Sequence, residues 1–158
     1  MSRVFTRAEA VQWVAEQRAA GRRIVFTNGV FDLLHPGHVR YLTAARAFGD
    51  VLIVGVNSDR SARLLEKGTD RPVNPAEERV EVLASVAMVD AVTIFDEPTP
   101  YEVVLALRPD VLVKGADWAL GTIVGADIVE ARGGRVERVA FASGYSTTAL
   151  IERVRQTR

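Results

Sequence analysis

The fold of this chain is decided by one stretch of sequence, Ile24-Val25-Phe26-Thr27-Asn28-Gly29-Val30-Phe31-Asp32-Leu33-Leu34-His35-Pro36-Gly37-His38. Its β-branched and aromatic start, Ile24–Phe26, predicts a buried strand, and Asn28-Gly29 breaks that strand. Pro36 suits the first turn of a helix, because its fixed φ fits there and its missing N–H would have had no partner. Apolar residues continue at helical spacing until Gly49 ends the helix. The stretch therefore predicts a strand, a glycine turn and a helix start.

The only two histidines of the chain, His35 and His38, stand three residues apart at this helix start. Side chains at i and i+3 share a helix face, so both imidazoles are expected to point at the same small volume. That volume lies at the positive end of the helix dipole, beside backbone N–H groups that have no partner within the helix. Gly37 has no Cβ and leaves room for a phosphate to approach the backbone. These features together predict a polyphosphate site.

The histidines also allow two other interpretations. They can be ordinary structural side chains, although the strand, glycine turn and helix start around them favour a functional site. They can also bind a metal, but a zinc site usually takes three or four ligands. The chain has no cysteine and no third histidine, so carboxylates alone would have to complete such a site. We therefore expect no protein-held metal ion.

Composition limits the class of protein. The chain has 158 residues, 48% of them hydrophobic, which fits one globular domain with a real core. The formal net charge is zero, so bulk charge does not favour nucleic acid as a partner. The first residues lack the apolar core of a signal peptide. The longest clearly apolar run, Val51–Val56, is far shorter than the ~20 residues that span a membrane. We expect a soluble cytoplasmic protein without a membrane partner.

Strands alternate with helices along the chain. Thr6 to Arg18 is predicted to form a helix, so that residues 1–21 precede a catalytic core of residues 22–158 within one domain. Further strands are predicted at Val51–Val56, Ala91–Phe95, Val111–Val113 and Val136–Ala140. Capping boxes at Asn74-Pro75-Ala76-Glu77 and Thr99-Pro100-Tyr101-Glu102 each open a helix, and Arg79 on the first of these faces solvent or phosphate. The predicted class is α/β: a Rossmann-like, doubly wound, mostly parallel five-stranded sheet of order 3-2-1-4-5 with helices on both faces.

Three loops at the carboxyl ends of these strands are expected to meet. The third of them, Ser146-Thr147-Thr148, opens the last helix and offers hydroxyls and amides to phosphate oxygens, although these residues alone favour a plain helix cap. Asn57-Ser58-Asp59 follows the second strand and is either part of the site or a cap for the next helix. Only two of the twenty basic residues are lysines, Lys67 and Lys114, and both fall in loops near this edge. The other two loops carry Thr27, Asn28, Phe31, Asp32, His35 and His38, and Lys114, Asp117 and Trp118.

The segment Gly29-Val30-Phe31-Asp32-Leu33-Leu34-His35-Pro36-Gly37-His38 resembles the Gly-x-Phe-Asp-x-x-His-x-Gly-His signature of the nucleotidyltransferase superfamily, which includes the cytidylyltransferases. Tyr145-Ser146-Thr147-Thr148 is similar to the second motif of that superfamily, which binds nucleotide phosphates. The chain departs from this motif at Ile151, where many members carry arginine or lysine. Arg153 stands two residues later and can substitute for it.

Further segments are similar, in order and spacing, to the heptose 1-phosphate adenylyltransferase branch of the superfamily. The resemblance implies that ATP and D-glycero-β-D-manno-heptose 1-phosphate, a sugar 1-phosphate, are joined into ADP-heptose and pyrophosphate, in the service of bacterial surface glycan synthesis. It also implies a Mg²⁺ ion held mainly by the triphosphate, a homodimer or larger homo-oligomer, and a separate sugar kinase upstream. The segments are Thr27–Asp32, Val56–Asp59, Arg71–Asn74 and Leu112–Trp118.

The resemblance implies a role for each candidate residue. His35, His38 and Lys114 stabilise charge on the phosphoryl oxygens, and Arg46 and Lys67 are secondary cations. Trp118 either stacks on the base or packs against the protein. Two alternatives stay open: a cytidylyltransferase acting on glycerol 3-phosphate or another phosphorylated polyol, and a nucleotide-binding regulator without turnover. The nucleotide is expected to contact Thr27, Asn28, Gly29, Val30, Phe31, Asp32, Gly37, Arg46, Gly115, Asp117, Trp118, Ser146, Thr147 and Thr148, and the sugar phosphate Asn57, Asp59, Lys67 and Arg71.

Overall fold

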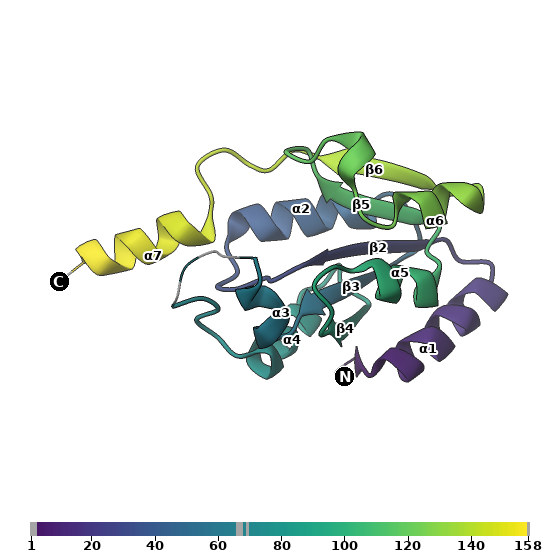
Figure 1. Cartoon of the computed structure of the whole chain (residues 1–158), viewed down its shortest axis with the longest axis horizontal. Helices are drawn as coiled ribbons and strands as arrows, with labels where there is room; N and C mark the ends of the chain where they lie inside the picture. The colour runs from purple at the N-terminus through teal and green to yellow at the C-terminus, as the bar shows by residue number, and fades with distance from the viewer. Residues whose placement is uncertain (1–2, 66–67, 69, 158) are drawn as a thin grey trace.

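A parallel β-sheet forms the centre of the molecule, with helices on both of its faces (Figure 1). The computed structural model describes residues 3–65, 68 and 70–157. Within these ranges the sheet has six strands in the order β1-β4-β3-β2-β5-β6, and every neighbouring pair is parallel. The strands are β1 Val4–Phe5, β2 Ile24–Gly29, β3 Val51–Asn57, β4 Ala91–Phe95, β5 Val111–Gly115 and β6 Arg135–Val139.

The predicted α/β class is confirmed, but the predicted number of strands was wrong. The additional strand, β1, has two residues and pairs with Val92 and Thr93 at the edge of the sheet. A two-residue strand is too short to give an alternating pattern, so sequence periodicity could not have found it. The other five strands run β4-β3-β2-β5-β6, which is the predicted order 3-2-1-4-5, and β1 extends this order at one edge of the sheet.

Helices begin close to their predicted positions, but neither of the two predicted capping boxes forms. The residues that cap α4 and α5 are Pro75 and Pro100, and neither makes a side-chain cap bond. At α4 the backbone N–H of Ala76 is instead bound by the carboxylate of Asp59, so a distant side chain does the work of a local cap. The helices are α1 Arg7–Ala19, α2 Pro36–Arg46, α3 Asp59–Arg63, α4 Ala76–Ala84, α5 Tyr101–Leu107, α6 Ala126–Ala131 and α7 Thr147–Gln156, with a 3₁₀ turn η1 at Leu120–Thr122.

Two hydrophobic cores lie on the two faces of the sheet. Phe26 of β2 packs in the core that includes Trp13 of α1 and Val104 of α5. Its neighbour Val25 packs in the other core, with Leu42 of α2 and side chains of α4. Adjacent strand residues point to opposite faces, so a strand covered on both sides is apolar throughout, as β3 is up to its last residue.

The last helix, α7, projects from the rest of the fold (Figure 1). The Oγ1 of Thr147, its first residue, donates to the backbone oxygen of Asp32, and Arg155 near its end pairs with Asp70. Most of its other side chains are exposed. Among the described residues, no helix combines the length and the apolar character that a membrane crossing needs.

Candidate active site

A cleft of about 580 Å³ opens at the carboxyl ends of the central strands. Because the order there is β4-β3-β2-β5, the loop after β2 lies in the middle of the cleft. The loops after β3 and β4 lie toward one end, and the loop after β5 lies toward the other. The lining residues are Asn28–Asp32, His38, Tyr41, Asn57, Leu65, Arg71, Pro98–Pro100, Lys114, Gly115, Asp117, Trp118, Val124, Phe141 and Thr147.

The two histidines cap the helix α2 and lie against each other. Nδ1 of His35 accepts from the backbone N–H of Gly37 at 3.1 Å, and Nδ1 of His38 accepts from the backbone N–H of His35 at 3.3 Å. Their ring centres are 3.9 Å apart. Because each Nδ1 accepts a hydrogen bond, this network assigns the proton of each neutral ring to Nε2. The local fold thus sets the same tautomer in both rings.

Burial favours the neutral form of His35. Desolvation lowers the pKa of the His35 imidazole below its ordinary value, which favours the neutral ring that the cap requires. The ring stacks on Tyr145, with centres 6.3 Å apart. A Cβ at Gly37 would lie 2.8 Å from Cε1 of His35 and 2.9 Å from Cβ of Tyr145, so the space beside Gly37 is filled by these side chains. Gly37 is therefore needed for this packing, apart from the predicted role of leaving room for a phosphate.

The turn between β2 and α2 is built on Asp32. The residues on either side of it, Phe31 and Leu33, have φ of 53° and 51°, in the left-handed region that few non-glycine residues adopt. The Asp32 carboxylate is buried and accepts from the backbone N–H groups of Val73 (2.6 Å) and Asn74 (3.0 Å). Asp32 therefore fastens the cleft loop to the segment that carries Arg71, and its carboxylate oxygens are engaged by the protein itself.

Asp59 and Arg79 form a second structural link beneath the cleft. The prediction that Arg79 faces solvent or phosphate was wrong, because its side chain is fully buried. Its guanidinium donates to the backbone oxygens of Val30 (2.6 Å) and Asn74 (2.9 Å), and to Oδ1 of Asp59 (2.8 Å). The same Asp59 oxygen accepts from the N–H of Ala76. The structure thus uses Asp59, expected at the sugar phosphate, to hold α4, and Asp59 does not line the cleft.

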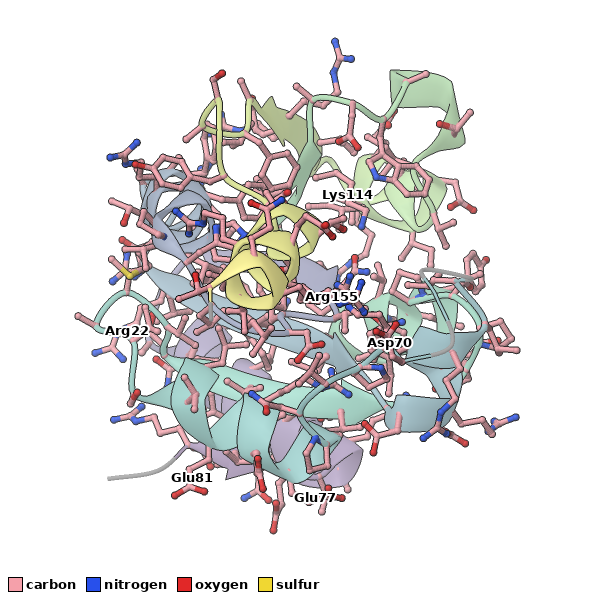
Figure 2. The ribbon with its side chains drawn as sticks, turned by 90° about the vertical axis from the view of Figure 1, so that its left-hand side faces the viewer. Arg22, Asp70, Glu77, Glu81, Lys114 and Arg155 are labelled. Atoms are coloured by element: carbon pink, nitrogen blue, oxygen red, sulfur yellow. The ribbon has the colours of Figure 1, made fainter. Side chains whose placement is uncertain are left out.

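Positive and aromatic groups line the rest of the cleft. Nζ of Lys114 lies 5.1 Å from the ring centre of Trp118, and this indole is 43% exposed. The Arg71 side chain is 12% exposed, and its Nε lies 3.5 Å from Oδ2 of Asp32 without forming a hydrogen bond. Figure 2 views the molecule from this side, with Lys114 above α7 and with Arg155 next to its partner Asp70.

Several candidate residues lie away from the cleft. The Thr27 hydroxyl is fully buried, where it donates to the oxygen of Val113 and contacts the Tyr41 hydroxyl. Arg46 ends α2, and the rise of the helix places it about 12 Å along the axis from His38 and about 17 Å from His35. There it binds Asp90 and the oxygen of Gly49, so the assignment of Arg46 to the nucleotide does not agree with its position. Ser146 accepts from the N–H of Ala149 as an ordinary cap, Thr148 is exposed outside the cleft lining, and Lys67 lies outside the described residues.

Sequence reasoning missed the aromatic wall of the cleft and one of its loops. Tyr41 stacks on Phe141 with ring centres 5.0 Å apart, and burial raises the pKa of Tyr41 to about 12. The sequence pattern identified Pro98-Thr99-Pro100 only as a helix start. Its position after β4 was a usable signal, because the carboxyl ends of parallel strands share one edge. No sequence signal would have paired Tyr41 with Phe141, which are 100 residues apart.

The fold and the site together define a Rossmann-like α/β protein whose cleft is lined by nitrogen-bearing side chains suited to anions. The chain belongs to the cytidylyltransferase-like family, whose model matches residues 26–153. This membership confirms the resemblance drawn from Gly29–His38. The matched range includes both histidines and the start of α7.

Individual relatives agree with this assignment. The bifunctional proteins HldE of Geobacter sulfurreducens and Koribacter versatilis are each 54% identical to this chain, over 89% and 96% of its length. The chain spans only 29% and 31% of those two relatives. The crystal structure of the lipopolysaccharide core biosynthesis protein from Thermoplasma volcanium superposes with a TM-score of 0.65. It is 28% identical, and the match covers 80% of this chain and 100% of that one.

Proposed function

We propose that this chain is a nucleotidyltransferase that joins ATP and D-glycero-β-D-manno-heptose 1-phosphate into ADP-heptose and pyrophosphate. The observation that carries the proposal is the pair of closely packed imidazoles at the start of α2, beside a cleft that also contains Lys114. The heptose is suggested by the motif resemblance, by the HldE relatives and by the similarity to a lipopolysaccharide core biosynthesis protein.

The proposed reaction is a direct displacement at phosphorus. An oxygen of the sugar 1-phosphate attacks the α-phosphorus of ATP, the bond from that phosphorus to the β-bridging oxygen breaks, and pyrophosphate leaves with the electron pair. A phosphate monoester is already ionised near neutral pH, so no general base is needed. The protein therefore has to hold the two substrates in line and stabilise charge on the phosphoryl oxygens.

The histidine tautomers suit that task. His38 lines the cleft, and His35 lies directly behind it without being part of the lining. In the proposed reaction Nε2–H of each ring donates to phosphoryl oxygens, and because Nδ1 is bound to the backbone, neither ring has to reorganise. Lys114 supplies a positive charge at the β5 end of the cleft. Thr147 and the backbone of Asn28–Phe31 complete the phosphate site.

The two ends of the cleft suit two different substrates. The β5 end presents Asp117 and the exposed ring of Trp118, on which a purine base can stack. The other end presents Asn57 and Arg71, an amide and a guanidinium that suit a phosphorylated polyol. The reacting phosphates then meet in the middle, beside His38.

A magnesium ion would enter with the triphosphate, because magnesium keeps several waters and binds readily to substrate phosphates. It would add positive charge at the phosphoryl oxygens. In the part of the chain that the structure describes, no three His, Asp or Glu side chains are grouped closely enough to hold a metal ion.

A reaction that phosphorylates the sugar at its anomeric carbon must supply the second substrate.

The test is pyrophosphate release measured across a matrix of nucleoside triphosphates and phosphorylated sugars or polyols. We expect the highest kcat/KM for ATP with the heptose 1-phosphate. A maximum for CTP with glycerol 3-phosphate would replace the proposal with a cytidylyltransferase. Release with no pair, together with a thermal shift on adding ATP, would identify a nucleotide-binding regulator.

A further inference from the structure

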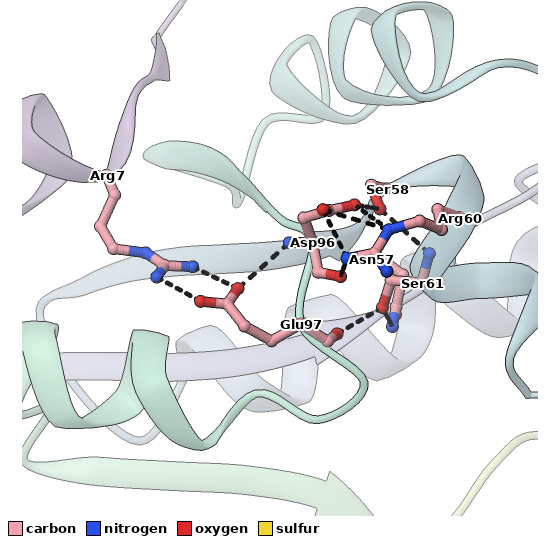
Figure 3. Close-up of polar contacts among 7 residues, drawn as sticks. All are labelled: Arg7, Asn57, Ser58, Arg60, Ser61, Asp96 and Glu97. Carbon is pink, nitrogen blue, oxygen red and sulfur yellow. Dashed lines mark hydrogen bonds and ion pairs between the residues drawn. The ribbon is translucent and has the colours of Figure 1, made fainter.

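Asn57 ends β3 at the cleft and is held by a short chain of hydrogen bonds. The residue is almost completely buried, yet it lines the cleft. Nδ2 of Asn57 donates to Oγ of Ser61 at 2.9 Å, and that hydroxyl donates to the backbone oxygen of Glu97 at 2.7 Å (Figure 3). The chain therefore runs from the cleft, through α3, to the loop that follows β4.

The direction of this chain follows from its last member. A backbone carbonyl can only accept, so the single proton of the Ser61 hydroxyl is used on Glu97. Ser61 Oγ can then only accept from Asn57, and the side of the carboxamide that faces Ser61 must be the NH₂ group. Oδ1 of Asn57 is thereby turned away from Ser61. Because Asn57 lines the cleft, this arrangement offers the cleft an acceptor atom.

The chain is anchored at its far end. Ser61 is fully buried, and its own backbone N–H donates to Oγ of Ser58. Glu97 is fixed by a bidentate pair with Arg7 at the start of α1, with distances of 2.6 and 2.8 Å. The hydrogen bonds from Arg7 lower the pKa of the Glu97 carboxylate to about 2, so the pair stays ionised at neutral pH. The fixed Glu97 backbone therefore keeps the Ser61 hydroxyl from turning and releasing the amide.

We infer that Ser61 is a positioning residue that orients the amide of Asn57, so that Oδ1 accepts a hydrogen bond from a hydroxyl of the second substrate. This inference rests on the proposed function and adds to it a reason for selecting a polyol. A phosphorylated compound without a hydroxyl at that place leaves Oδ1 buried without a donor. Such a compound binds more weakly, because it shields Oδ1 from solvent without offering a hydrogen-bond donor in exchange.

The first experiment compares Ser61→Ala and Ser61→Thr in the full chain by pyrophosphate release. Alanine should raise KM for the heptose 1-phosphate about three- to tenfold, the size of one hydrogen bond, and leave KM for ATP within about twofold. Threonine keeps the hydroxyl and should recover most of the loss. Ser85→Ala removes a similar hydroxyl bond at the end of α4 and serves as the control. Equal rises in both KM values in Ser61→Ala would overturn the inference.

The second experiment tests the acceptor itself with monodeoxy analogues of the heptose 1-phosphate. One analogue should bind wild type about three- to tenfold more weakly than the parent compound and should bind Ser61→Ala with a much smaller penalty. Calorimetric titration gives these affinities without turnover, so they separate this inference from a failure of the proposed reaction. If Ser61→Ala does not fold, Asn57→Leu replaces it, with the same loss of discrimination expected. No selective penalty in wild type, or no binding of the parent compound, would refute the inference.

Discussion

The amino ends and the carboxyl ends of the strands are alike in how their carboxylates are bound, but they differ in where their nitrogen-bearing side chains lie. At the amino ends of the strands, three carboxylates accept from backbone N–H groups at or next to the first residue of a strand. Arg46 lies there too, and its guanidinium pairs with one of these carboxylates. These acids and this arginine thus have partners within the protein. The three bonds are Asp50 to Arg23, Asp90 to Leu52 and Asp110 to Ile24.

At the carboxyl ends, carboxylates again bind the backbone, as Asp32 does with Val73 and Asn74. The carboxyl ends differ in the cleft that they form. His38, Arg71 and Lys114 line a cleft of about 580 Å³ there, whereas a smaller hollow of about 350 Å³ at the amino ends is lined by arginines, Arg22, Arg23, Arg132 and Arg135. With Asp32 engaged by amides, donors and cations dominate the middle of the cleft. Both linings suit an anion, and the comparison favours the carboxyl ends for a triphosphate because the larger cleft, with a histidine and a lysine in its lining, lies there.

The largest effect on stability should come from Arg79→Met, at the cleft edge. The substitution leaves the oxygens of Val30 and Asn74 without their buried donor and takes the charge partner from Asp59. We expect the free energy of unfolding to fall by about 3 kcal/mol. Urea denaturation followed by circular dichroism measures it. A loss below about 1 kcal/mol, like that of a surface pair, would mean that this network does not hold the cleft edge together.

The largest effect on turnover should come from His38→Ala. Removing one donor that acts on the developing charge typically lowers kcat about 100- to 1,000-fold. Stability should change little, because the cap bond lost, to the N–H of His35, is a long one at 3.3 Å. Pyrophosphate release and a thermal melt of the same sample separate the two effects. An unchanged kcat would remove His38 from the reaction and leave it as a helix cap.

The sequence predicted what depends on local pattern. The strand and the helix around His35 and His38 follow from residues close together in the chain. The parallel order of the five longer strands follows from the general rules for alternating strands and helices. These are also the features that determine the family.

What it could not predict depends on contacts between distant segments. Asn57 ends β3 and Asp59 follows two residues later; both are polar, yet Asp59 binds Arg79 and Asn57 lines the cleft. Arg46 and Arg71 are both arginines, and only the length of α2 places Arg46 away from the site. Polar residue types indicate a site, but hydrogen bonds within the folded protein determine which of those side chains can still bind a ligand.

A smaller effect separates the two roles of His35. Burial lowers the pKa of the His35 imidazole in the folded protein. As pH falls through about 6.5, the unfolded chain therefore takes up a proton at this residue more readily than the folded protein does. Its cap therefore stabilises the fold above that pH and is lost below it. His35→Ala should cost about 1 kcal/mol at pH 7.5, whereas His35→Asn keeps a cap that does not titrate. Melting temperatures from pH 7.5 to 5.5 should fall less in His35→Asn than in wild type. Parallel curves would show that this cap does not depend on the neutral ring.

The smallest effect should come from Arg46→Met, at the other end of the same helix. Its ion pair with Asp90 is about one-third exposed on both sides, and such pairs contribute at most about 1 kcal/mol. The methionine keeps most of the aliphatic stem, and Asp90 keeps its bond to the N–H of Leu52. Turnover and KM for ATP should match wild type. A rise in KM for ATP of tenfold or more would mean that charge at the amino edge reaches the nucleotide. Because water and salt screen charges over about 10 Å and Arg46 lies farther than that from the histidines, we expect the two edges to act independently.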